Sequence, residues 1–173
     1  GDYYDVFPRP GAIPEDDRVF LIVADVAGKS IPAAMLMATL QASLRTLSNT
    51  PSSLSQIVSG LNQYACSNSQ GGTRFTTAFI AELDPVTRKL TYINAGHNAP
   101  FLVQPGGFAR LDTGGTPLGL FEKAGYDTGT VRLAAGDLLV AFSDGVTEAI
   151  DGREEEFGDA RLEACLHGAW SRP

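Results

Sequence analysis

The chain has 173 residues, of which 43% are hydrophobic and 19% are charged, and its formal net charge is −7. That length suits a single domain with a buried core, and the acidic balance excludes the basic footprint expected of a protein that binds nucleic acid or an anionic membrane surface. The longest apolar runs, such as Val19–Ala24, are far shorter than the about 20 residues that cross a bilayer, so no direct membrane insertion is expected.

Two strands are predicted near the start of the chain. Tyr3–Phe7 alternates weakly between polar and apolar side chains, and the proline-rich segment Pro8–Gly11 ends it. Val19–Ala24 is continuously apolar and rich in β-branched residues, which favours a strand buried on both faces.

A helical hairpin is predicted next. Ser30 is a suitable N-cap for a helix over Ala33–Leu47, and Ser52 or Ser53 precedes a second helix that ends near residue 65. The apolar stripe of the first helix is expected to contain Met35, Leu36, Thr39, Leu40, Ser43, Leu44 and Leu47. In the simplest interpretation, the hairpin covers one face of a sheet.

The remainder of the chain is mostly β. Strands are predicted at Phe75–Leu83, Lys89–Ile93, Pro100–Val103, Phe108–Leu111, Tyr126–Leu133 and Leu138–Phe142. The last two are expected to pair with each other across a short turn, and a helix is predicted near Ala160–Leu166. Because the strands outnumber the helices and mostly follow one another, an α+β fold with antiparallel sheets is predicted rather than a doubly wound βαβ fold.

Few residues suit a side-chain nucleophile and its base. The two cysteines, Cys66 and Cys165, have neither a disulfide framework nor a metal-type spacing. They are expected to be small buried hydrophobes in a reducing compartment, which makes the cytoplasm the expected location. His97 is expected to be a hydrogen-bonded structural residue at a corner between strands, and His167 a surface residue. The run from Gly28 to Ser30 lacks the upstream glycine of a phosphate-binding P-loop.

Carboxylates at strand ends are the strongest chemical feature. Asp25 and Asp144 each follow a predicted buried strand, each has a glycine shortly after it, and Asp2 begins another strand. If the three side chains converged, they would repel one another unless a cation neutralised them. Oxygen ligands suit hard ions such as Mg²⁺, Mn²⁺ or Ca²⁺. The alternative is that Asp25 and Asp144 are ordinary turn and N-cap residues.

Short motifs occur in a fixed order along nearly the whole chain. They are Gly1–Phe7, Asp25–Ser30, Arg74–Phe79, Leu83–Pro85, Asn94–Pro100 and Ser143–Ala149. In this order the motifs resemble those of SpoIIE/RsbU-type bacterial serine phosphatase domains. The resemblance implies a PP2C-like fold, a four-layer α/β/β/α sandwich of two antiparallel sheets flanked by helices. It also implies that residues 1–173 are one such domain, truncated at both ends and lacking a further acid from a late Asp-Asp-x-Thr block.

The resemblance implies a metal-dependent activity. Two Mn²⁺ or Mg²⁺ ions would be held by Asp2, Asp25, the backbone oxygen of Val26 and Asp144, with Asp25 bridging the ions and Asp25 and Asp144 as the catalytic residues. A metal-bridging water would attack the phosphorus of phosphoserine or phosphothreonine. Asp5 is a weaker candidate that would assist through water.

The same resemblance suggests partners. The expected substrate is a phosphorylated anti-sigma-factor antagonist of the STAS type, and the expected regulator is an upstream sensor domain or activator protein. The predicted hairpin over residues 32–65 would then be a switch that moves Asp25 and Val26, and a homodimer is compatible with this scheme. The alternative function is a catalytically inactive PP2C-like module that binds or signals.

Overall fold

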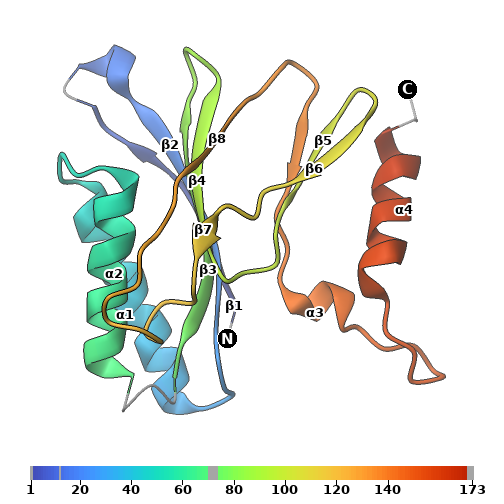
Figure 1. The fold of residues 1–173 in the computed structure, drawn as a ribbon, viewed down its shortest axis with the longest axis horizontal. Coiled ribbons are helices and arrows are strands. Elements are labelled where there is room, and N and C mark those ends of the chain that lie inside the picture. Colours follow the sequence, from blue (N-terminus) through green and yellow to red (C-terminus); the bar gives the residue numbers. More distant parts are fainter. Residues whose placement is uncertain (1, 12, 70–73, 171–173) are drawn as a thin grey trace.

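The computed structural model describes residues 2–11, 13–69 and 74–170. The secondary structure is arranged in layers, with two helices against a large sheet, a small sheet on the other side, and a last helix outside it (Figure 1). The expected α+β architecture of two sheets flanked by helices is therefore confirmed.

The large sheet has the order β1-β2-β3-β4-β7, and β8 also pairs with β4. Its strands are β1 (Asp2–Arg9), β2 (Arg18–Val26), β3 (Thr76–Asp84), β4 (Lys89–Ala95), β7 (Gly114–Gly115) and β8 (Gly129–Arg132). A 3-10 helix at Pro14–Asp16 lies between β1 and β2. All the pairs are antiparallel except the short contact of β4 with β7, which is parallel.

The small sheet has the order β6-β5-β9. Its strands are β5 (Phe101–Gln104), β6 (Gly107–Arg110) and β9 (Leu138–Val140). The expected pairing of the two late strands with each other is wrong, because β8 joins the large sheet and β9 joins the small one. The turn between them is fixed by Asp137, whose Oδ2 accepts hydrogen bonds from the Ala134 amide and from Gln104 of β5. This turn transfers the chain from one sheet to the other.

Helices α1 (Ile31–Ser48) and α2 (Leu54–Asn68) cover the outer face of the large sheet. Both predicted caps are confirmed. The Ser30 side chain accepts from the Ala33 amide, and Ser53 forms a reciprocal capping box with Gln56. The predicted stripe of α1 is partly wrong. The buried residues of this helix are Ala33, Leu36, Met37, Leu40, Leu44 and Ser48, whereas Met35 is 63% exposed.

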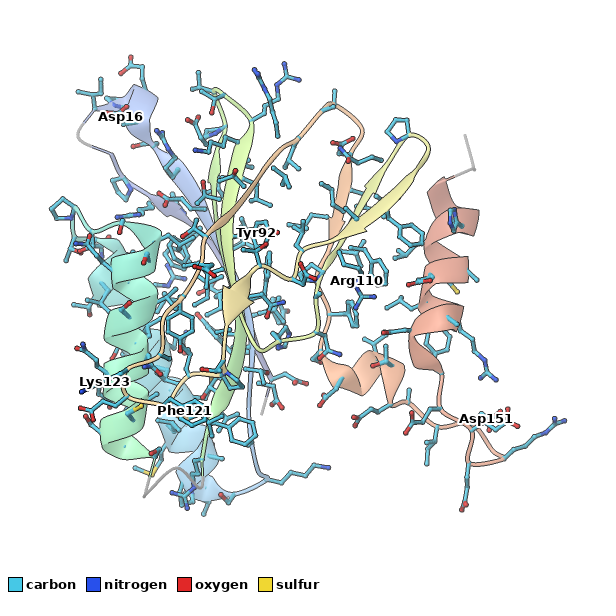
Figure 2. The ribbon with its side chains drawn as sticks, viewed as in Figure 1. Asp16, Tyr92, Arg110, Phe121, Lys123 and Asp151 are labelled. Carbon is cyan, nitrogen blue, oxygen red and sulfur yellow. The ribbon has the colours of Figure 1, made fainter. Side chains whose placement is uncertain are left out.

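The core between the two sheets is smaller than the core under the helices. It contains Phe79, Ala81, Leu90, Tyr92, Leu102 and Leu111, and Figure 2 shows Tyr92 near the middle of the molecule. The small sheet covers β2 incompletely, so Phe20, Ile22 and Ala24 are buried while the alternate residues of that strand are half-buried. The expectation that Val19–Ala24 would be buried on both faces is therefore only half right.

Helix α4 (Gly158–Trp170) packs on the outside of the small sheet through Leu162 and Leu166. Arg110 of β6 lies over the Phe101 ring, 4.0 Å from its centroid, and Figure 2 places this arginine between the sheet and the helix. Cys165 of this helix is exposed, so the expectation that it would be buried is wrong, while Cys66 is half-buried. No helix in the described parts of the chain is both long and apolar enough to cross a membrane.

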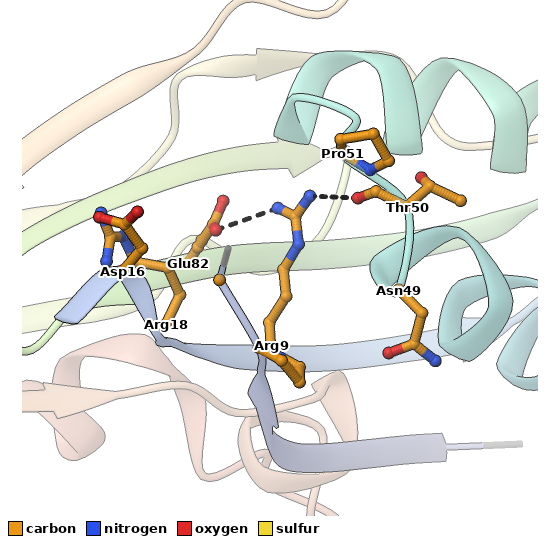
Figure 3. A pocket seen from close by; sticks show the side chains of 9 residues that line it. Arg9, Asp16, Arg18, Asn49, Thr50, Pro51 and Glu82 are labelled. Atoms are coloured by element: carbon orange, nitrogen blue, oxygen red, sulfur yellow. Dashed lines mark hydrogen bonds and ion pairs between the residues drawn. The ribbon is translucent and has the colours of Figure 1, made fainter. Parts of the chain in front are cut away.

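Arg9, at the end of β1, connects the large sheet to the loop between α1 and α2 (Figure 3). Its guanidinium pairs with Glu82 of β3 at 3.0 Å and donates to the carbonyl oxygens of Ser48 and Thr50, both at 2.9 Å. Arg9, Glu82 and Thr50 line an open cleft. Because Arg9 is buried and its donors are used by the protein itself, this cleft has a structural role, and it lies at the opposite end of β1 from Asp2.

Candidate metal centre

The strand register brings two of the candidate acids together. Asp2, the first residue of β1, is the cross-strand partner of Asp25, the penultimate residue of β2. Side chains of directly opposed residues have their Cβ atoms about 4.5–5.5 Å apart. The two carboxyl groups therefore emerge at the same end and on the same face of the large sheet.

The third acid comes from the other sheet. Asp144 begins the short helix α3 (Asp144–Thr147), which follows β9 after a three-residue link. Carboxylate oxygens of Asp2, Asp25 and Asp144 all lie within 4.8 Å of one another. Asp2 is exposed and the other two are half-buried. The convergence predicted from the sequence is thus present in the structure, and both sheets contribute to it.

These acids lie in an open cleft of about 410 Å³, which we call the carboxylate cleft. Its other lining residues are Val26, Gly28, Lys29, Gly145, Glu148 and Ala149. Val26, whose backbone oxygen is a candidate ligand, therefore lies beside the three acids. Lys29 contributes a cationic side chain to a cleft that otherwise contains carboxylates.

Glu148 is a cleft residue that the sequence analysis did not identify. Its amide donates to the Asp144 carbonyl at 2.7 Å, so the two acids are one helical turn apart. Residues separated by four positions lie on the same side of a helix. The Asp144–Glu148 spacing was therefore the sequence signal for a second acid in the cleft. It does not stand out, because many other acids follow in the sequence.

The alternative interpretation of the acids as ordinary turn and cap residues does not describe their positions. Asp25 lies within β2, and the N-cap of α3 is Ser143, so Asp144 is the first helical residue. Side-chain repulsion among three carboxylates at this distance favours a bound cation. The all-oxygen donor set fits a hard divalent ion such as Mg²⁺ or Mn²⁺.

Asp5 does not belong to this cluster. Because side chains alternate along a strand, Asp5 lies on the opposite face of β1 from Asp2. It accepts hydrogen bonds from the Tyr3 hydroxyl at 2.8 Å and from Arg45 of α1. Burial alone would raise the pKa of Asp5, but these two hydrogen bonds and the Arg45 charge lower it below its usual value. The expected role of Asp5 near the metal is therefore wrong.

His97 is buried and hydrogen-bonded, as predicted. Its Nδ1 lies 2.9 Å from the Thr77 hydroxyl, and its amide donates to the Asn94 side chain at 2.7 Å. Burial lowers the pKa of the imidazole, while the Phe142 carbonyl and the nearby Asp carboxylates act in the opposite direction. Burial therefore favours the neutral form of the ring beside the acidic cleft.

Comparison with known proteins assigns the family. The family model described as "Stage II sporulation protein E (SpoIIE)" matches residues 15–173. A curated relative, "Phosphoserine phosphatase RsbU" of Bacillus subtilis, is 32% identical over 150 residues, which are 86% of this chain and 43% of that protein. The chain spans less than half the length of the curated relatives it matches.

Two solved structures share the fold. The structure of the RsbU and RsbW domains of Rv1364c from Mycobacterium tuberculosis has a TM-score of 0.81 and 25% identity, covering 99% of this chain and 47% of that one. The PP2C phosphatase domain of SpoIIE from Bacillus subtilis, solved with a fragment of its regulatory domain, has a TM-score of 0.78 and 18% identity. This match covers 96% of this chain and 47% of that one. Since the family match extends from residue 15 to the last residue, the chain belongs to the SpoIIE family of PP2C-like serine phosphatase domains.

Proposed function

We propose that this chain is the catalytic domain of a metal-dependent phosphatase that removes phosphate from phosphoserine or phosphothreonine on a regulatory protein. The observation that carries the proposal is the convergence of Asp2, Asp25 and Asp144 within 4.8 Å at an open cleft. The phosphoserine phosphatase among its relatives supports the reaction class. An open cleft also suits a phosphorylated side chain that is still attached to a folded protein.

Two Mn²⁺ or Mg²⁺ ions are the proposed cofactors. Asp2, Asp25, Asp144 and the backbone oxygen of Val26 would hold these ions. Bound together, such ions supply an activated water nucleophile and neutralise the phosphoryl oxygens. Asp25 and Asp144 are therefore the proposed catalytic residues, acting by fixing the ions against the substrate.

Lys29 would then orient the substrate. It lies in the turn between β2 and α1 and lines the same cleft as the three acids. A cation at the edge of an acidic cleft attracts the phosphate dianion and offsets its repulsion by the carboxylates.

We further propose an anti-sigma-factor antagonist of the STAS type as the substrate, and an upstream sensor domain or activator protein as the regulator. The neighbour that carries RsbU and RsbW domains supports a place in such a circuit. A signal from the regulator would reach the cleft through α1, because this helix begins directly after the Asp25–Ser30 segment. A cytoplasmic location and a homodimer are compatible with this scheme.

The test is phosphate release from a purified phosphoserine protein of that class, with and without Mn²⁺. We expect Mn²⁺-dependent release by the wild-type protein and its loss in Asp25→Asn and in Asp144→Asn. Asp16→Asn, a matched change in the exposed 3-10 helix away from the cleft, should retain activity. Equal release by wild type and both cleft variants would contradict the assignment, whereas no release and no Mn²⁺ binding by the wild-type protein would favour the inactive binding or signalling module.

A further inference from the structure

The corner between β4 and β5 has a rigid conformation. Asn94 is buried, and its side chain accepts from the His97 amide at 2.7 Å and donates to the carbonyls of His97 at 3.0 Å and Leu111 at 3.2 Å. Gly96 has a φ of +68°, and a Cβ there would lie 2.6 Å from the Pro117 ring. The backbone of His97 is therefore held in one position by both a hydrogen-bond frame and close packing.

On one side, His97 contacts the strand that supports Asp25. Thr77 of β3 is the cross-strand partner of Asp25 in β2. Its hydroxyl lies 2.9 Å from His97 Nδ1 and 3.5 Å from the Asp25 carbonyl oxygen. The imidazole is thus linked to the backbone of Asp25 through a single side chain.

On the other side, the corner runs beside the segment that leads to Asp144. Phe101 of β5 pairs with Val140 of β9 in an antiparallel ladder, so the residues before Phe101 lie alongside those after Val140. The rings of Phe101 and Phe142 stack with centroids 5.7 Å apart. Figure 1 shows this connection crossing from the large sheet to the small one near α3 and the N-terminus.

The Phe142 carbonyl, two residues before Asp144, acts on the ring from the side opposite Thr77. Within the described residues, His97 Nε2 is fully buried and meets no partner at full hydrogen-bonding geometry. A buried polar atom of this kind is costly and calls for a functional explanation. His97 is only 7% exposed, so the ring has little contact with bulk water.

We propose that His97 is a positioning residue that fixes the separation of Asp25 and Asp144, and so the geometry of the carboxylate cleft. The inference rests on the proposed metal site, but the link itself belongs to the metal-free protein. Asp25 lies in the large sheet, and Asp144 begins α3, which follows β9 of the small sheet. A residue between the two sheets can therefore set the cleft width without touching the substrate.

The test uses paired variants that keep the shape of the side chains. Thr77→Val removes the hydroxyl but keeps the branched shape, Thr77→Ser keeps the hydroxyl, and His97→Phe keeps a ring without nitrogens. We expect Thr77→Val and His97→Phe to weaken Mn²⁺ affinity about 10-fold or more, as loss of a group that orients a ligand does, and Thr77→Ser to retain near-wild-type affinity. Thr91→Val, the same change within β4, is the matched control.

Amide hydrogen exchange of the metal-free chain provides the second measurement. If His97 links the two sheets, Thr77→Val and His97→Phe accelerate exchange both around Asp25 and over residues 142–146. Acceleration confined to residues 94–100, with unchanged Mn²⁺ affinity, would overturn the inference. If the wild-type chain bound no Mn²⁺, the proposed function would fail, while hydrogen exchange would still decide whether His97 links the strand ends.

Discussion

Asp2 and Asp25 are directly opposed in the antiparallel ladder of β1 and β2. Like charges placed opposite each other on one face of a sheet destabilise the pair, and Asp144 adds a third carboxylate within 4.8 Å. Without a cation the cluster is unfavourable, and with one it becomes a binding site. The same three residues should therefore affect stability in opposite directions in the metal-free and metal-loaded protein.

The first prediction concerns Asp144→Asn. In the metal-free protein, removal of one charge should raise the free energy of unfolding by roughly 1 kcal/mol, which corresponds to about 2–4 °C in melting temperature for a chain of this size. With Mn²⁺ at 100 times its dissociation constant, the wild type should gain about 2.7 kcal/mol, and the variant much less. Thermal melts with EDTA and with Mn²⁺ measure both effects. A variant that is less stable than wild type under both conditions would contradict the prediction.

The local parts of this site could be predicted from the sequence. The apolar run of β2, the aspartate at its end and the Ser30 cap of α1 depend on neighbouring residues only. The parity of residue numbers along β1 was also sufficient to place Asp2 and Asp5 on opposite faces.

The non-local parts could not be predicted in the same way. Nothing within Tyr126–Leu133 or Leu138–Phe142 indicates that the two segments belong to different sheets. Their separation depends on Asp137, which binds Gln104 of another strand. The exposure of Met35 likewise depends on how α1 is rotated against the sheet, which the packing of the whole helix decides.

The second prediction is a pH dependence from Asp5. Because the Tyr3 hydroxyl and Arg45 lower the pKa of Asp5 against the effect of burial, the folded state favours the charged carboxylate. Its contribution to stability is present above the unfolded pKa of about 3.9 and is lost as pH falls through the lower folded pKa. Asp5→Asn should therefore be less stable than wild type at pH 7, and the difference should shrink as the pH falls below about 3.9.

Urea unfolding at several pH values measures this effect. Arg45 is partly exposed, so the difference should also shrink at high salt. Asp127→Asn, the same change at an exposed site, is the control and should show no such pattern. A constant Asp5→Asn effect from pH 3 to pH 7 would show that the ion pair is not its cause.

The third prediction concerns Arg9. Its replacement by methionine leaves Glu82 without its partner and exposes the Ser48 and Thr50 carbonyls to an apolar side chain. Breaking a buried pair in this way should cost about 3 kcal/mol of unfolding free energy. A double-mutant cycle with Glu82→Gln isolates the contribution of the Arg9–Glu82 ion pair to the free energy of unfolding. Additive effects of the two changes would mean that the carbonyl contacts, rather than the ion pair, stabilise this end of the molecule.

The fourth prediction concerns Gly114, which lies against the strand that supports His97. A Cβ at this position would lie 1.9 Å from the Asn94 carbonyl oxygen and 2.5 Å from its amide nitrogen. Because both neighbours are backbone atoms, the clash cannot be relieved by a side-chain rotation. Gly114→Ala should therefore displace Asn94, which holds the His97 corner, and should destabilise the protein by about 3 kcal/mol or more.

Gly125 provides the matched control for that change. A Cβ at Gly125 meets no atom within 4 Å, so Gly125→Ala should be neutral, or stabilising by up to about 1 kcal/mol through the unfolded chain. Urea unfolding compares the two variants directly, and Mn²⁺ affinity shows whether the displacement reaches the cleft. If Gly114→Ala were as stable as Gly125→Ala, the close approach of β7 to β4 would have to be absent in solution. Loss of stability with weaker Mn²⁺ binding is the expected result, because Asn94, His97 and Thr77 form one continuous path from Gly114 to Asp25.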